Sequence, residues 1–245
     1  MVKYDDTKCD KEGKKTTEKH LFANPMEPLV CLFLALGVFF ALDSLHFLTT
    51  EKIFQSDDNK DNAASQRYCT QLAELFTKNR LLLQAFIRLD HANSHGLCKG
   101  SATNATSGTT LPPPTSSVAA RGEWSLGRVL DLYWHFAEPG DTYLGRILMG
   151  ADPNSPDFGV LPPHWTVGNP MENPTMKSAI ELMYGDILNK WGENSHCDPT
   201  AILCFVLPSV VYHSDFLQAT IREFSGHPFS AIPVLNNPEL LRDLK

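Results

Sequence analysis

Five stretches of the chain place apolar residues at helical spacing. Residues 29–42 form an uncharged apolar run, and from residue 66 to residue 87 apolar side chains recur every three or four positions. The same spacing returns over residues 129–136 and in two C-terminal segments, residues 176–190 and 199–224. A repeat near the helical period places such side chains on one face of a helix. The pattern therefore predicts a mainly α-helical (α+β) chain.

Turn-forming residues divide these helical stretches. Residues 1–5 and 16–23 flank a polar, lysine-rich stretch at 7–15, which is typical of a turn between two short strands. We therefore expect a small N-terminal β-hairpin. Three prolines at 112–114 and a proline-rich loop at 151–174 mark two further boundaries, because proline cannot donate a backbone hydrogen bond.

The apolar run at residues 29–42 is 14 residues long and is followed by Asp43. A helix that spans a bilayer needs about 20 apolar residues. The run therefore predicts a buried helix in a soluble core, and we expect no membrane partner.

Charge and cysteine content limit the classes of function. The net charge is −7, which argues against a protein that holds DNA by its overall charge, although lysines crowd the first twenty residues. Six cysteines form no CxxC pair, so we expect reduced thiols in the nucleus or the cytoplasm. His196, Cys197 and Cys204 form too small a ligand set for structural zinc, and we expect no metal or cofactor.

Three segments form an ordered set of motifs: KHLFANPMEPLVC at residues 19–31, SHGLCKGSATNATSGTTLPPP at 94–114 and WSLGRVLDLYWHFAEPGDTYLGR at 124–146. VLPPHW at 160–165 and, more weakly, VVYHSDFL at 210–217 extend the set over most of the chain. The set resembles the catalytic half of crypton-type tyrosine recombinases of eukaryotic mobile elements. This resemblance implies a truncated catalytic domain at residues 1–150 and a helical C-terminal extension at 151–245.

The same resemblance assigns site residues. His95 and Cys98 match a His-x-x-Arg motif, so a cysteine stands where the family has an arginine. Trp124 lies nine residues before Tyr133, as the His or Trp of the family precedes the nucleophilic tyrosine. Lys8, on the expected hairpin turn, matches the lysine acid of the family, and Lys11 is the competing choice.

The chemistry implied is attack by the tyrosine hydroxyl on a DNA phosphodiester, which needs no metal. Two arginines normally stabilise the negative charge that develops on the phosphate. The second is replaced by Cys98, and the family places the first upstream of the hairpin, where we expect no equivalent before Lys8. We therefore expect an inactive enzyme, although Arg121 and Arg128 flank Trp124 as conceivable replacements.

Two classes of function remain open. The first is a recombinase or integrase remnant that retains weak binding to DNA or associates with intact recombinase copies. The second is a non-catalytic helical interaction module that reuses the fold, and an acidic surface near Tyr133 would favour it. A Cys-His nucleophile pair at His95 and Cys98 is a third reading, but no third orienting residue is identifiable.

Overall fold

The computed structural model describes residues 18–42, 63–85, 94–127, 138–166, 169–194 and 199–245. The chain forms two compact units. The larger unit contains residues 1–49 and 145–245, and the smaller unit contains residues 50–144. The division falls inside one helix, α8.

The described elements are helical, which confirms the prediction of a mainly α-helical chain. The smaller unit contains α3 (Ala63–Lys78), α4 (Arg80–Leu83), α5 (Ser94–Ser107), α6 (Thr115–Gly122) and the first part of α8 (Glu138–Leu148). The larger unit contains the 3-10 helix η1 (Pro28–Val30), α1 (Leu32–Leu42), η3 (Pro156–Gly159), η4 (Pro170–Glu172), α9 (Pro174–Asn194), α10 (Pro199–Tyr212), α11 (Ser214–Glu223), η5 (Pro228–Ala231), η6 (Pro233–Asn236) and α12 (Pro238–Leu244).

The N-terminal β-hairpin gains no support. Most of it falls on residues 1–17, which lie outside the described residues. The described end of its second strand, residues 18–23, forms no regular strand.

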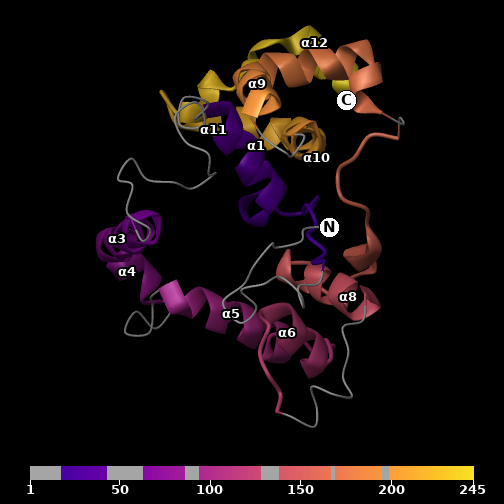
Figure 1. The fold of residues 1–245 in the computed structure, drawn as a ribbon. Coiled ribbons are helices and arrows are strands. Elements are labelled where there is room, and N and C mark those ends of the chain that lie inside the picture. The colour runs from indigo at the N-terminus through magenta and orange to yellow at the C-terminus, as the bar shows by residue number, and fades with distance from the viewer. Residues whose placement is uncertain (1–17, 43–62, 86–93, 128–137, 167–168, 195–198) are drawn as a thin grey trace. The chain divides into compact units, whose positions relative to one another are not determined.

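Helix α1 lies against α9 and α10 in the core of the larger unit (Figure 1). Its buried residues, Leu34, Gly37 and Phe40, recur every three positions and so share one face. A Cβ atom on Gly37 would lie 2.6 Å from Val210 Cγ2, so only glycine permits this close approach of α1 to α10. The Tyr184 hydroxyl of α9 donates a hydrogen bond to the Gly37 carbonyl at 3.3 Å, and burial raises the pKa of Tyr184.

The predicted buried helix at residues 29–42 is therefore confirmed for one face, but it starts later than expected. Pro28 begins the short η1, in which the Glu27 carboxylate accepts a hydrogen bond from the Leu29 amide, and α1 follows from Leu32. Leu29 is 78% exposed. Among the described residues no single helix is long and apolar enough to cross a membrane; by length and composition alone, α10 and α11 pass that test together, with a bend of 59° between them.

Prolines set the starts of the short C-terminal helices. They occupy the first turn of η5, η6 and α12, where a helix leaves its amide groups without an internal partner. The three helices pack against one another and against α9 and α11, and they bury Ile232, Val234 and Leu241. The proline-rich end of the chain is therefore folded against the same core as α1.

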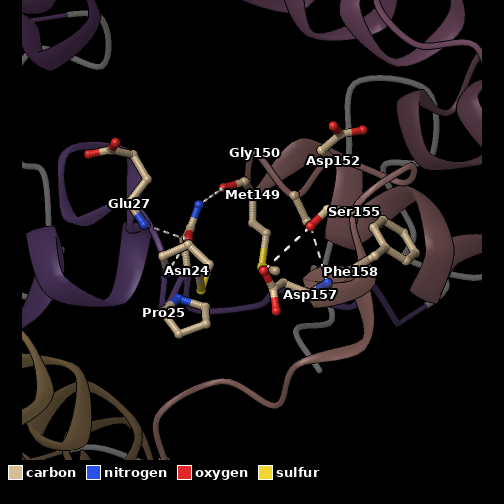
Figure 2. Close-up of a pocket in the computed structure, with 11 residues that line it drawn as sticks. Asn24, Pro25, Glu27, Met149, Gly150, Asp152, Ser155, Asp157 and Phe158 are labelled. Atoms are coloured by element: carbon tan, nitrogen blue, oxygen red, sulfur yellow. Dashed lines mark hydrogen bonds between the residues drawn. The ribbon is translucent and has the colours of Figure 1, made fainter.

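Asn24 connects three parts of the larger unit through both its backbone and its side chain. Figure 2 shows the hydrogen bonds of its side chain to Glu27 and Met149. Its Oδ1 accepts hydrogen bonds from the amides of Met26 and Glu27, at 2.8 and 2.9 Å, and its Nδ2 donates to the Met149 carbonyl at 2.8 Å. Its carbonyl oxygen accepts a hydrogen bond from His213 Nε2 at 2.9 Å. Asn24 itself is only 2% exposed, so its own polar atoms depend on these partners rather than on water.

We predict that Asn24→Ala lowers the free energy of unfolding by about 3 kcal/mol, because three part-buried backbone groups, on Met26, Glu27 and Met149, lose their partner. Urea denaturation followed by circular dichroism measures the effect. The matched control is Asn169→Ala, which removes an exposed asparagine whose side chain accepts the Met171 amide at the start of η4, and it should cost about 1 kcal/mol. Equal losses in the two variants would contradict the role given to Asn24.

Candidate functional site

The second sequence motif begins on α5, and the third runs from the residues that follow α6 into α8. His95 and Cys98 lie in the first two turns of α5, three positions apart, which is the spacing of neighbours on one helix face. Their side chains are outside what the structure describes. Helix α5 contacts α6, so the two helices form one packed layer within the smaller unit.

Helix α6 is joined to the first part of α8 by a buried ion pair. Arg121 Nη1 lies 2.7 Å from Asp141 Oδ1, and the two side chains are 14% and 1% exposed. A carboxylate at such depth needs a partner, because an unpaired buried charge is costly. The Arg121 guanidinium therefore binds a carboxylate of α8 and is largely withdrawn from the surface.

Two further contacts fix the first turns of α8. Gly140 approaches Ser117 of α6 so closely that a Cβ atom on Gly140 would clash with the Ser117 hydroxyl. The Tyr143 hydroxyl donates a 2.6 Å hydrogen bond to the Leu111 carbonyl, in the connection between α5 and α6. Asp141 lies between these contacts in sequence, so its position relative to α6 is set from both sides.

Helix α6 ends in a left-handed turn that orients Trp124. Glu123 has φ 55° and ψ 36°, and the Trp124 amide donates to the Ala119 carbonyl at 2.9 Å. This is the usual hydrogen bond of a helix that ends in a left-handed residue. A Cβ atom on Gly122 would lie 2.8 Å from Trp124 Cε2, so the indole ring lies over Gly122. Trp124 remains 50% exposed.

The predicted site residues are described only in part. Lys8 and Tyr133 lie outside the described residues, as do Arg128, His196 and Cys197. The expected convergence of Tyr133, His95, Trp124 and Cys98 on one face therefore stays a prediction. In the part of the chain that the structure describes, no group of three or more His, Cys, Asp or Glu residues is placed to hold a metal ion.

Among the described residues, α5, α6, the turn after α6 and the first part of α8 carry no excess of basic side chains. The described residues of 94–127 and 138–144 include two basic side chains, Lys99 and Arg121, and three acidic ones, Glu123, Glu138 and Asp141. Pairing with Asp141 also neutralises Arg121. This region has little net attraction for phosphates.

A small cavity of about 210 Å³ lies in the larger unit between residues 24–27 and residues 149–158 (Figure 2). Its carboxylates already stabilise local turns. Asp152 Oδ1 accepts the Asn154 amide at 2.9 Å, and the hydroxyl of Ser155 donates weakly to Asp157 Oδ2 at 3.5 Å. We therefore interpret these carboxylates as turn-stabilising groups rather than ligands.

The first motif packs against the end of the third. Arg146 lies 5.0 Å above the ring of Phe22, and its Nη1 donates to the carbonyls of Phe158 and Val160 at 2.8 and 3.0 Å. A Cβ atom on Gly145 would lie 2.7 Å from the His20 carbonyl oxygen. Both motifs thus contribute to packing in the larger unit, which their separate positions in the sequence did not indicate.

A buried Cys31–His213 pair is a feature that the sequence did not single out. Cys31 Sγ accepts hydrogen bonds from the amides of Asn24 and Leu34, at 3.3 and 3.4 Å. Burial raises the pKa of the Cys31 thiol, but the hydrogen bonds from His213 and the two amides outweigh it, so the pKa lies below its usual value. The pair joins the start of α1 to the end of α10. Both side chains are at most 5% exposed, so a dissolved substrate does not reach them.

No protein-family model, curated protein or solved structure matches this chain.

The left-handed residue at the end of α6 generates a prediction. Glu123→Gly should raise the free energy of unfolding by about 1 kcal/mol, because glycine adopts this backbone conformation without the Cβ penalty. Thermal and urea denaturation measure the change. Glu123→Ala is the control, since it also removes the carboxylate but keeps the penalty. If Glu123→Ala stabilises the protein as much as Glu123→Gly, charge rather than backbone strain is responsible.

Proposed function

We propose that this chain is a descendant of crypton-type tyrosine recombinases that does not cleave DNA. The order and spacing of the motifs support the ancestry, from His95 and Cys98 to Trp124 and Tyr133. The observation that carries the loss of cleavage is the ion pair between Arg121 and Asp141. Arg121 is the described arginine that lies closest in sequence to Trp124. The ion pair keeps its guanidinium from binding a phosphate.

The energetic reason lies in the charge that develops during strand cleavage. Loss of one donor that stabilises such charge slows catalysis by about 10²- to 10³-fold. Cys98 stands at an arginine position of the family motif and carries no fixed positive charge. A guanidinium bonded to a buried carboxylate cannot at the same time donate the same N–H group to a phosphate. Cys98 and Arg121 together therefore leave the reacting phosphate poorly stabilised.

The remaining role in this proposal is weak association with DNA or with intact recombinase copies. The non-basic balance of charge around Trp124 limits the DNA affinity, which should fall further as salt rises. The same balance favours a second candidate, a helical interaction module without nucleic-acid binding. Helix α3 supports that alternative, because Tyr68 and Leu75 on it are 44% and 52% exposed.

We predict that the protein forms no covalent adduct with DNA and that Cys98→Arg alone does not restore one. The assay uses a nicked suicide substrate, from which a released short strand makes cleavage irreversible, with an active tyrosine recombinase as the positive control. The readout is a DNA-linked protein band. Groups that act together in catalysis have strongly non-additive effects, so one added guanidinium is insufficient.

Tyr133→Phe is the specificity control, because it removes only the attacking hydroxyl. A band that forms with the unmodified chain and disappears in Tyr133→Phe would overturn the proposed loss of cleavage. A band that requires Cys98→Arg would show that a second arginine already stabilises the charge on the reacting phosphate.

A further inference from the structure

We propose that Cys31 and His213 form a thiolate–imidazolium ion pair that latches the start of α1 to the junction of α10 with α11 and releases it in acid. Cys31 immediately precedes α1, and His213 lies between α10 and α11. The two residues are far apart in sequence, so their contact is a long-range link within the larger unit. The inference is independent of the proposed function, because neither residue is among the predicted recombinase site residues.

Two backbone amides and one imidazole contact the sulfur of Cys31. The amides of Asn24 and Leu34 donate to Sγ at 3.3 and 3.4 Å, and His213 adds a hydrogen bond from its side chain. A neutral thiol is a weak acceptor, whereas a thiolate is stabilised by every N–H group directed at it. The Leu34 amide also belongs to the first turn of α1, where the helix dipole favours a negative charge.

The hydrogen bond on the other side of the His213 ring determines which ring nitrogen takes the proton. His213 Nε2 lies 2.9 Å from the Asn24 carbonyl oxygen, which can only accept, so Nε2 carries a hydrogen. Nδ1 is then the nitrogen that takes the thiol proton. The S–H bond breaks, an N–H bond forms at Nδ1, and the proton stays within the pair, so no further reactant is needed.

His213 is the charged group that controls this thiol. Burial raises the pKa of Cys31, and His213 together with the amides of Leu34 and Asn24 lowers it below its usual value. Of the described ionisable groups, His213 alone acts on the thiol by its charge. The surrounding elements carry other ionisable groups: Glu18, Lys19, His20 and Glu27 before α1, Tyr184 on α9, Cys204 and Tyr212 on α10, Asp215 on α11 and His227 before η5.

Acid should open the latch by protonating the thiolate. Because the pKa of Cys31 is lower in the folded chain, its ionised form stabilises the fold fully above the unfolded value of about 8.5. This stabilisation is lost as the pH falls through the folded value. The amides of Asn24 and Leu34 then lose a charged acceptor, and the start of α1 loosens from the junction.

The first measurement is an NMR titration of the Cys31 Cβ resonance in the unmodified chain labelled with carbon-13, because this resonance shifts when the thiol ionises. We expect it to titrate at a lower pH than in the chain unfolded in urea. A resonance that titrates at the same pH in both states overturns the inference. A thiolate resonance that persists until acid unfolds the whole chain contradicts the release in acid.

His213→Gln tests the ion pair, because glutamine keeps a hydrogen-bond donor but cannot take the thiol proton. We expect the Cys31 titration to move to higher pH by at least about one unit, a tenfold change in ionisation. The control is His227→Gln, which removes a half-buried histidine from the start of η5 and should leave the titration unchanged. A folded His213→Gln in which Cys31 titrates as in the unmodified chain overturns the ion pair.

Hydrogen exchange measures the release itself. The amides of Asn24 and Leu34 should lose protection as Cys31 titrates, after correction for the intrinsic pH dependence of exchange. The Leu241 amide, which donates to the Asn237 carbonyl at the start of α12, reports global unfolding and should stay protected. If the two amides stay protected through the titration, or open together with Leu241, there is no latch. Both this measurement and the NMR titration use the unmodified chain, so they decide the inference even if His213→Gln does not fold.

Discussion

The fold of the larger unit depends on the hydrogen bonds of one buried residue, Asn24. Its side chain organises the turn before α1 and holds the Met149 carbonyl at the end of α8, while its backbone bonds to Cys31 and His213. Because Asn24 is buried, its own polar atoms have no water to replace a lost partner. The start of α1, the end of α8 and the junction of α10 with α11 are therefore one coupled structure.

This coupling gives a structural role to parts of the sequence motifs at residues 19–31, 124–146 and 210–217. Residues 19–31 supply Asn24 and Cys31, residues 124–146 end in the arginine that lies over Phe22, and residues 210–217 contain His213. These parts of the motifs stabilise the larger unit.

The sequence predicted the local helices well and their long-range packing poorly. The stretch that has helical spacing from residue 66 forms α3 and α4, with a break at Asn79. The expected helix at residues 199–224 is broken at His213, where the side chain turns toward Asn24. Periodicity reports which face of a helix is buried, but it does not report a partner 189 residues away. The pairings of Asn24 and of Gly37 with Val210 were for that reason not predictable.

The candidate site shows the same limit in terms of charge. In the sequence Arg121 is a cation three residues before Trp124. Nothing there distinguishes an arginine that binds phosphate from one that pairs with a carboxylate of the fold. The distinction comes from Asp141, which lies 20 residues later and meets Arg121 only because α8 packs against α6. A guanidinium attracts whichever oxyanion is held closest to it. Whether this region binds a phosphate therefore depends less on which cations lie near Trp124 than on which of them the fold has already neutralised.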